Sequence, residues 1–574
     1  MLKSSPSQNQ IKDLLSLYNK NSFHQLILKT SDLLNLFPNS FLLYNILGAA
    51  YSGVKEFNLA IKCYRKSITI NSNFADGYNN LGIVYKEKGD LKSAIQNFNK
   101  ALKIKPNYAE ALNNIGVVYK DSEDLDLALK NFKEALEIKP NYPDAYNNIG
   151  NVLKDKGFLD EAIKNYNQAI NINPNFTEAY NNKCEVLEKL NKINDLEKVI
   201  IAFKNKVNQN NFDLFYYEAL LKYRQKNYRL CLKIFEEYKL SYFSEKLKAS
   251  ILFLKGNCNH KMKKFSKAFE NFSDMNKTVK NSDKYRKLNV KLYFNRIKER
   301  QNDLIKLKNS TFKKIHYPKL DKQPIFLIGF PRSGTTLLDT VLRTHSEIEV
   351  VEEQWMVSNI EQKLTKSLNT NQIENLAERF LNKARNLYFS ELSKHTNIKN
   401  NSRTIDKFPL NILNIPLINK VFPEGKYILA LRHPLDCILS NFMQNFKLNV
   451  AMANMLEIDQ IVKFYCLSMH IFELCHKRYN LDVHKIKYED LINDFENEVY
   501  SLLKFLNLDW EQALVNFHLT AKKRKVINTP SYSQVIQPIY KDSTYKWKSY
   551  SNQLEKYFQN VEYWVEKFGY ESLK

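Results

Sequence analysis

The 574-residue chain lacks the long apolar runs and the cysteine pattern that would mark a membrane protein or a disulfide-stabilised one. No window approaches the roughly 18 apolar residues that a transmembrane helix needs. Its seven cysteines are scattered, and an odd number of them cannot form a closed disulfide framework. The first ten residues are polar, unlike a secretory signal peptide. We therefore expect a cytoplasmic protein without a transmembrane segment.

Patterns for metal and nucleic-acid binding are missing as well. There is no Walker-B pattern and no group of His, Cys and Asp at ligand spacing, so we expect no metal. The net charge is +25, but no recognisable nucleic-acid module accompanies it, and we do not expect nucleic acid as a partner.

Most of the positive charge lies in the middle of the chain. Residues 201–310 hold 26 Lys and Arg but 10 Asp and Glu. Such a stretch could attract an acidic acceptor or an anionic lipid. The alternative, which we favour, is a Lys-rich bias on solvated helix faces.

The N-terminal half of the chain repeats with a period of 34 residues. Three registers in phase carry the period, namely Pro38, Ser72, Pro106, Pro140 and Pro174; Gly48, Gly82, Gly116 and Gly150; and Ala60, Ala94, Ala128 and Ala162. This is the pattern of tetratricopeptide (TPR) repeats, in which a small residue lets two helices pack closely and a proline ends the second helix. Gly256 and Ala268 keep the offset seen between Gly82 and Ala94, so the solenoid is predicted to reach about residue 300.

Repeated Tyr-Asn-Asn stretches at 78–80, 146–148 and 180–182 allow two interpretations. The asparagines could hydrogen-bond an extended peptide in a concave groove, or they could serve solvent-facing helix packing. We favour packing for individual asparagines. For the concave surface as a whole we favour docking of an acceptor protein or peptide.

In the C-terminal half, residues 329–336 (Gly-Phe-Pro-Arg-Ser-Gly-Thr-Thr) follow one apolar run and precede another. The pattern predicts a strand, a phosphate-cradling turn and a helix. Thr335 stands where a Walker A loop has its lysine, which makes ATP a poor ligand. Backbone N–H groups around Gly334 and the helix N-terminus still suit a dianion. Side-chain donors are expected from Arg332, Ser333, Thr335 and Thr336.

A second anion-binding pattern comes about a hundred residues later. The apolar run 425–431 predicts a strand, Arg432 stands at its end, and Pro434 fits the first turn of a helix. Ser440 would lie two turns along that helix, below Arg432. Together with the first loop, this pair resembles the sulfotransferases that use 3′-phosphoadenosine 5′-phosphosulfate (PAPS). The resemblance implies that the loop binds the 5′-phosphosulfate and that Arg432 and Ser440 bind the 3′-phosphate.

Further motifs, over about residues 323–568, resemble the tyrosylprotein sulfotransferases and the bacterial repeat-linked enzymes similar to them. Eight residues after His345 comes Glu353, which the resemblance makes the general base; its neighbour Glu352 is the alternative. Lys407, in an Asp-Lys-Phe-Pro motif, is implied to lie near the transferred sulfate. Tyr488, on a third strand, is assigned either cofactor contact or a structural role.

The last block, residues 529–540 with the pair Lys546–Trp547, reproduces the family's Gln-Val-x-x-Pro run and its closing basic-Trp pair. The resemblance implies that this segment folds over the cofactor. Lys546 and either Ser531 or Ser533 would lie near the phosphosulfate.

The sequence thus predicts an all-α TPR solenoid (1–300, degraded after about 200), a linker (301–322) and a P-loop-like α/β sulfotransferase domain (323–574) with a mostly parallel sheet. The expected reaction is metal-free transfer of a sulfuryl group to a hydroxyl, most simply of a protein tyrosine. Glu353 would take the proton, while Lys407, Arg332 and Lys546 neutralise charge. Glycan, lipid or small-molecule acceptors remain alternatives, as does a TPR scaffold whose nucleotide domain is not catalytic.

Overall fold

A computed structural model of the protein describes residues 5–206, 212–308, 323–365, 368–396, 402–523, 535 and 544–573. The chain divides into two compact units, Met1–Leu214 and Phe215–Lys574. Among the described helices, none combines the length and the apolar character required to cross a bilayer.

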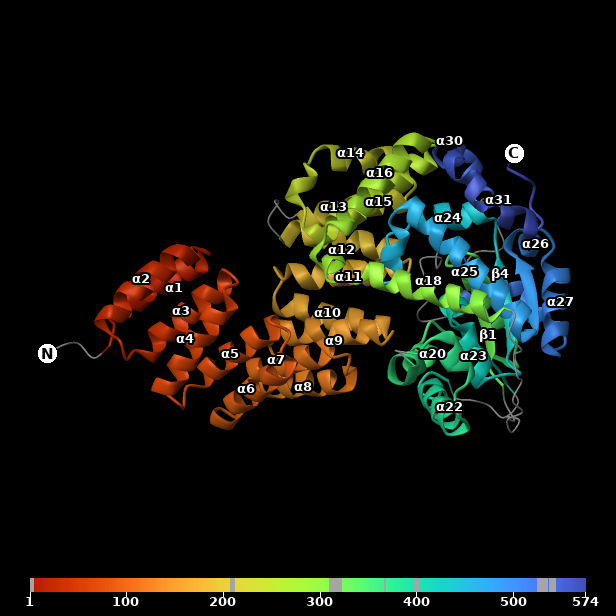
Figure 1. The fold of residues 1–574 in the computed structure, drawn as a ribbon. Coiled ribbons are helices and arrows are strands. Elements are labelled where there is room, and N and C mark those ends of the chain that lie inside the picture. Colours follow the sequence, from red (N-terminus) through yellow and green to blue (C-terminus); the bar gives the residue numbers. More distant parts are fainter. Residues whose placement is uncertain are drawn as a thin grey trace. The chain divides into compact units, whose positions relative to one another are not determined.

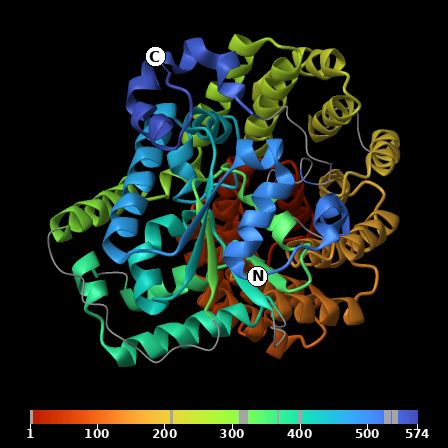
Figure 2. The same ribbon diagram turned by 90° about the vertical axis from the view of Figure 1, so that its right-hand side faces the viewer.

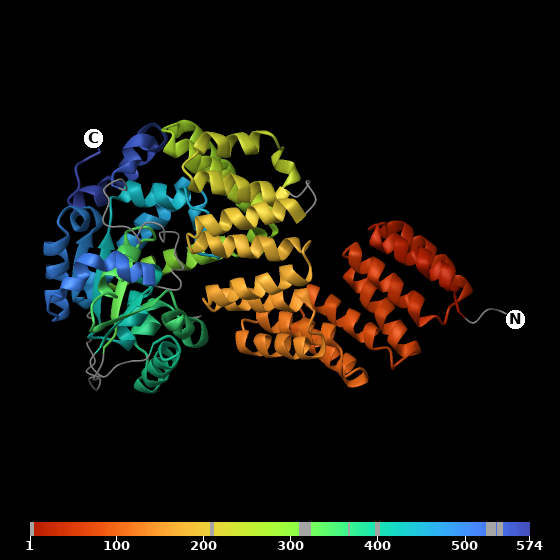
Figure 3. The same ribbon diagram turned by 180° about the vertical axis from the view of Figure 1, so that it is seen from behind.

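The first unit is a series of antiparallel helix pairs (Figures 1 and 3). Its helices are α1 (Gln8–Asn19), α2 (Phe23–Leu36), α3 (Phe41–Gly53), α4 (Phe57–Ile70), α5 (Ala75–Glu87), α6 (Leu91–Ile104), α7 (Ala109–Asp121), α8 (Leu125–Ile138), α9 (Pro143–Asp155), α10 (Leu159–Ile172), α11 (Thr177–Lys189) and α12 (Ile193–Lys206). Polar caps start several of them; the Asp90 side chain, for example, accepts the N–H of Ser93 at the start of α6. The predicted TPR solenoid is confirmed.

The regular spacing of glycines in the repeats has a direct steric cause. A Cβ atom added at Gly116 would lie 2.6 Å from the Phe132 ring of the paired helix, and one at Gly82 would lie 2.6 Å from Phe98. Both rings are fully buried. Glycine at this register therefore lets the two helices of a repeat approach until an aromatic ring fills the space between them.

The repeated asparagines link neighbouring repeats. Asn114 Nδ2 donates to Asn79 Oδ1 at 3.0 Å, and Asn148 Nδ2 donates to Asn113 Oδ1 at the same distance, 35 residues apart in each case. Asn79 and Asn113 are buried. The asparagines thus serve helix packing as expected, but Asn79 of the first Tyr-Asn-Asn stretch is buried rather than solvent-facing, and its amide oxygen finds its partner in the next repeat.

The second unit begins with further helices and continues into an α/β domain. The helices are α13 (Phe212–Arg224, which spans the boundary), α14 (Tyr228–Glu236), η1 (Leu240–Tyr242), α15 (Glu245–Lys261), α16 (Phe265–Lys280), α17 (Asp283–Arg286) and α18 (Val290–Leu307). A Cβ at Gly256 would meet the Phe272 ring at 2.6 Å, and Ala268 is fully buried. The α15–α16 pair therefore keeps the packing of a TPR repeat.

The α/β domain is built on five parallel strands in the order β2-β3-β1-β4-β5 (Figure 2). They are β1 (Ile325–Gly329), β2 (Ile348–Glu352), β3 (Arg403–Lys407), β4 (Lys426–Leu431) and β5 (Val483–Lys487). All five residues of β1 are buried, as expected for a parallel sheet covered on both faces. The predicted mostly parallel sheet is confirmed.

Helices cover both faces of this sheet. They are α19 (Thr335–Leu342), α20 (Met356–Ile360), η2 (Glu361–Thr365), α21 (Thr370–Glu374), α22 (Glu378–Leu392), η3 (Pro409–Asn414), α23 (Ile415–Val421), α24 (Pro434–Phe442), η4 (Met452–Met455), α25 (Ile458–Tyr479), α26 (Tyr488–Asn493), α27 (Phe495–Leu506), η5 (Gln512–Asn516), α28 (Phe517–Lys523), η6 (Lys546–Tyr550), α30 (Ser551–Leu554), η7 (Glu555–Tyr557) and α31 (Phe558–Lys567). Side chains of β1 alternate between two cores. Phe326 and Ile328 join α20, α22 and α25 on one face, and Ile325 and Leu327 join α19 and α27 on the other.

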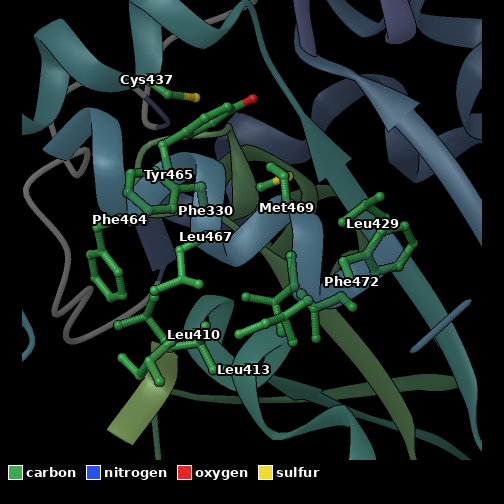
Figure 4. Packing of buried hydrophobic residues seen from close by; sticks show 14 of the residues in the cluster. Phe330, Leu410, Leu413, Leu429, Cys437, Phe464, Tyr465, Leu467, Met469 and Phe472 are labelled. Atoms are coloured by element: carbon green, nitrogen blue, oxygen red, sulfur yellow. The ribbon is translucent and has the colours of Figure 1, made fainter. Parts of the chain in front are cut away.

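The larger core also includes the helices that precede the sheet. Buried residues of α15, α16 and α18 belong to the same cluster as the strands, and Figure 4 shows part of this cluster around Phe330 and Tyr465, whose ring centroids are 5.1 Å apart. Asn276 Nδ2 of α16 donates to the Phe442 carbonyl at 2.9 Å, and Arg300 Nη1 of α18 donates to Asn414 Oδ1 at 2.7 Å. The end of the repeat region is thus packed into the core of the α/β domain. The domain limits at 300 and 323 stay a prediction.

Candidate active site

The predicted site residues follow the carboxyl ends of the five strands. Because the strands are parallel, these ends meet at one edge of the sheet, where open α/β sheets bind their ligands. The loop of residues 329–336 follows β1 and Arg432 follows β4, on either side of the point where the strand order reverses. Register pairs Gly329 with Ala430 across β1 and β4, and Glu352 with Lys407 across β2 and β3.

The loop after β1 has the backbone of an anion cradle. Arg332 and Gly334 adopt left-handed conformations, with φ of 70° and 95°. At Gly334 a Cβ would also lie 2.7 Å from the Tyr488 ring, so only glycine fits. The Ser333 hydroxyl is buried and has no hydrogen-bond partner among the described residues. A buried donor without a partner costs stability unless a ligand meets it, so the loop suits an anionic ligand.

The Arg432–Ser440 pair lies against this loop. Arg332 Nε donates to Ser440 Oγ at 3.1 Å, and Arg432 Nη1 donates to the Arg332 carbonyl at 3.2 Å. Tyr488 was predicted to lie on a strand, but it is the first residue of α26, directly after β5; the Arg432 guanidinium lies 4.9 Å from the centre of its ring. Four of the predicted cofactor-binding residues are therefore neighbours.

The two candidate glutamates share one lysine. Lys407 Nζ donates to Glu352 Oε1 and to Glu353 Oε1, each at 2.9 Å. Burial alone would lower the pKa of Lys407, but Glu353, Glu352 and Asp339 hold it above its ordinary value. The Lys407 ammonium is thus a fully buried, charged group at the strand edge.

Adjacent residues of an extended strand point to opposite sides, but the side chains of Glu352 and Glu353 do not. The strand ends at Glu352, and Glu353 adopts a left-handed φ of 51° while its N–H donates to the Lys407 carbonyl at 2.8 Å. This turn brings both carboxylates to one side. Their exposure differs, since the Glu352 side chain is 8% exposed and the Glu353 side chain 40%.

His345, whose spacing to Glu353 identified that residue as the base, lies away from the other predicted site residues. It precedes the first residue of β2 and therefore stands at the opposite edge of the sheet. Its Nδ1 accepts the N–H of Glu347 at 3.1 Å, and its Nε2 donates to the Asp509 carbonyl at 2.9 Å. Its contacts are those of a structural residue.

Lys546 begins the short helix η6, whose position is fixed by buried groups. The N–H of Trp547 donates to Asp436 Oδ1 at 2.9 Å, and the Trp547 ring stacks on His433 with centroids 5.0 Å apart. Asp436 also lies 3.7 Å from Arg432. Ser531 and Ser533 lie outside the described residues, so their predicted role stays a prediction.

Positive groups crowd around Lys546. Burial, followed by Arg432 and Lys261, lowers its pKa to about 8; Arg332 adds to the effect, while Asp436 opposes it. Like charges held together in this way are typical of a site that binds a multiply charged anion. No group of His, Cys, Asp and Glu that could hold a metal occurs in the described part of the chain.

The lowered pKa of Lys546 predicts that binding of adenosine 3′,5′-bisphosphate, the product expected from PAPS, depends on pH. A bound dianion would raise the pKa of Lys546, so binding above pH 8 takes up a proton, and affinity falls as pH rises. We expect the affinity for adenosine 3′,5′-bisphosphate to fall by up to about tenfold per pH unit above about pH 8. Lys546→Arg, which stays charged, should abolish the dependence. Calorimetric titrations at several pH values check this, and an equal slope in both proteins would contradict it.

Sequence reasoning missed two residues that orient the site. Asp436 is fully buried and holds both Arg432 and the backbone of Trp547. Glu489 accepts the N–H of His433 at 3.0 Å and the hydroxyl of Tyr570 at 2.8 Å. Both lie inside motifs already recognised, but their partners Trp547, His433 and Tyr570 are distant from them in the sequence.

Comparison with known proteins agrees with both halves of this description. Residues 324–512 match the model of the Sulfotransferase family, and four TPR-repeat matches span residues 55–191. A protein-tyrosine sulfotransferase A of Caenorhabditis elegans is 24% identical over 232 residues, which cover 39% of this chain and 60% of that protein. An uncharacterized protein of Aquifex aeolicus is 30% identical over 243 residues, which cover 41% of this chain and 31% of that protein.

Among solved structures, a tetratricopeptide repeat protein from Parabacteroides merdae covers 43% of this chain and 98% of its own, at 17% identity and a TM-score of 0.35. The predicted combination of domains is confirmed. The chain joins TPR repeats to a domain that matches the Sulfotransferase family model and is similar to the protein-tyrosine sulfotransferases.

Proposed function

We propose that the protein is a PAPS-dependent sulfotransferase that acts on an acceptor hydroxyl, with protein tyrosine as the favoured acceptor and the cytoplasm as its location. The observation that carries the proposal is the meeting of three groups at one sheet edge. They are the anion loop after β1, the Arg432–Ser440 pair after β4, and the Lys407–glutamate cluster after β2 and β3.

The residues present suit the nucleotide. The buried Ser333 hydroxyl and the N-terminus of α19 would bind the 5′ group, and Arg432 with Ser440 would bind the 3′-phosphate. PAPS supplies a sulfuryl group joined to a phosphate that leaves readily. A Thr335 side chain in place of a P-loop lysine suits a sulfonate, which carries less charge than a γ-phosphate.

The chemistry is an in-line displacement. A bond forms between the acceptor oxygen and sulfur, the bond from sulfur to the phosphate oxygen breaks, and its electron pair stays on the departing bisphosphate. The hydroxyl proton passes to the Glu353 carboxylate, which is the more exposed of the two glutamates. Lys407, Arg332 and Lys546 would offset the charge that develops on the sulfonate and the leaving oxygen.

The nucleotide part of the proposal is tested by titrating the purified protein with adenosine 3′,5′-bisphosphate, AMP and ATP. The bisphosphate should bind far more tightly than either of the others, because the site has separate groups for a 3′-phosphate. Equal affinity for ATP and the bisphosphate would overturn the assignment of PAPS.

We also propose that the repeats of the first unit dock the acceptor. Deleting residues 1–206 should raise the Michaelis constant for a macromolecular acceptor several-fold and leave that for PAPS nearly unchanged, since docking adds binding remote from the chemistry. Steady-state kinetics of both proteins measure this. If the truncated enzyme modifies its native acceptor at the full-length rate, the repeats serve another purpose. The cut must spare α15, α16 and α18, which belong to the catalytic core.

Two alternatives stay open. A glycan, lipid or small-molecule hydroxyl could replace tyrosine, since Glu353 would activate any of these. A scaffold with a non-catalytic nucleotide domain would keep the anion loop without needing the glutamates. The presence of Glu353 and Lys407 in contact favours the enzyme.

A further inference from the structure

The α15–α16 helix pair lies against both elements that carry the predicted 3′-phosphate and phosphosulfate residues. On α16, Asn276 Nδ2 donates to the carbonyl of Phe442, the last residue of α24, and the Phe269 ring lies 4.9 Å from the Phe442 ring. Helix α24 carries Ser440 and begins at Pro434, two residues after Arg432. The last repeat-like hairpin therefore supports the helix that is expected to grip the nucleotide.

The same hairpin holds η6, the helix that begins with Lys546. His260, in the last turn of α15, lies with its Nδ1 2.9 Å from the Tyr550 hydroxyl, and the two rings stack with centroids 5.9 Å apart. The Phe265 ring meets the same Tyr550 edge-on at 5.3 Å. Tyr550 is fully buried. The end of α15 and the start of α16 are thus packed against Tyr550, the last residue of η6, the short helix that begins at Lys546.

Lys261 directly follows His260 and ends α15. Its side chain is exposed, and it has no ion pair or hydrogen bond among the residues that the structure describes. Its charge acts on both His260 and Lys546, lowering the pKa of each together with burial. Lys261 therefore adds a fourth positive group to the cluster of Arg332, Arg432 and Lys546, although it comes from the repeat region.

Repulsion among these four cations is only partly offset by the nearby carboxylates of Asp436 and Glu489, so their grouping favours the binding of an anion. We propose that the α15–α16 hairpin completes the nucleotide site and that Lys261 is a further nucleotide-binding residue, which contacts a phosphate of the bisphosphate. This inference rests on the proposed function, because the ligand is the product of the proposed reaction.

The geometry also explains why a degraded repeat is kept beside the catalytic core. A hairpin that only extended the solenoid would need no contact with α24 or η6. Here its aromatic residues and Asn276 bind both elements, so the hairpin can set their positions as well as add a charge.

The test is a calorimetric titration of the full-length protein with adenosine 3′,5′-bisphosphate, using wild type, Lys261→Ala, Lys261→Arg and Lys267→Ala. Lys267 is an exposed lysine on α16, in the same hairpin, and it lines a pocket of about 520 Å³ together with Lys263 and Lys264. It therefore controls for a general loss of positive charge.

We expect Lys261→Ala to weaken binding by about five- to tenfold, Lys261→Arg to restore most of the affinity, and Lys267→Ala to bind within about twofold of wild type. The thermal unfolding midpoint of Lys261→Ala should equal that of wild type, because the side chain is exposed. If wild type binds the bisphosphate and Lys261→Ala binds it equally tightly, this inference is overturned and the proposed function stands. Equal losses in Lys261→Ala and Lys267→Ala would also overturn it, because they would indicate only long-range charge. Failure of wild type to bind the bisphosphate would overturn the proposed function and this inference together.

Discussion

Glu353→Gln is expected to lower turnover by about two to four orders of magnitude while leaving the affinity for adenosine 3′,5′-bisphosphate nearly unchanged. The amide keeps the shape of the side chain and can still accept a hydrogen bond from Lys407, but it cannot take the acceptor's proton. A base acts in the transition state, so its loss affects the rate rather than nucleotide binding. Single-turnover rates and calorimetry on the same protein measure the two effects separately.

Glu352→Gln is the matched control, because it removes one carboxylate from the same lysine at the same distance. Glu352 is largely buried, so its charge serves to balance Lys407. We expect a lower unfolding temperature and a mild change in turnover per folded molecule. A large loss of turnover at Glu352 with none at Glu353 would reverse the assignment of the base.

Arg432→Ala should remove most of the preference for adenosine 3′,5′-bisphosphate over AMP. Hydrogen bonds to a charged, desolvated phosphate contribute about 1.5–3 kcal/mol, which corresponds to roughly 10- to 150-fold in affinity. The affinity for AMP, which lacks the 3′-phosphate, should fall much less. Competition titrations with both nucleotides give the ratio directly.

Arg432 also supports buried neighbours, so a folding control is needed. It lies over the Tyr488 ring and 3.7 Å from the fully buried Asp436. Arg432→Lys keeps the charge but cannot form a planar, bidentate contact with a phosphate. It should therefore lose part of the preference for the bisphosphate over AMP. Ser440→Ala leaves the Arg432–Asp436 ion pair intact and should lose a smaller part of this preference. A folded Arg432→Ala protein that still prefers the bisphosphate would show that the 3′-phosphate is bound elsewhere.

The sequence predicted the solenoid and the parallel sheet because both depend on periodic patterns. The 34-residue period of glycine, alanine and proline reflects packing within each helix pair. The Phe132 ring packed against Gly116 is an example. The strands are short runs of buried apolar residues, as β1 illustrates. Strand order was not predictable in the same way, because pairing joins residues far apart in the chain.

Within the site, the sequence located the residues but not their mutual contacts. The turn at Glu353, with its left-handed φ, has no signal in a Glu-Glu pair that continues a strand pattern. Lys261 had no motif around it, only the basic bias of residues 201–310, and its place beside Lys546 depends on the packing of His260 and Phe265 against Tyr550. Such tertiary contacts follow from the folded core rather than from any local pattern.

The most direct test of the account is transfer of label from PAPS carrying radioactive sulfur. The purified full-length protein is incubated with the labelled nucleotide and a cell lysate, and protein, glycan and lipid fractions are counted; Glu353→Gln serves as the control. We predict label on protein, released as tyrosine sulfate after alkaline hydrolysis, with little transfer by the variant. A protein that binds adenosine 3′,5′-bisphosphate but transfers no label to any fraction would contradict the account and favour a nucleotide-binding scaffold.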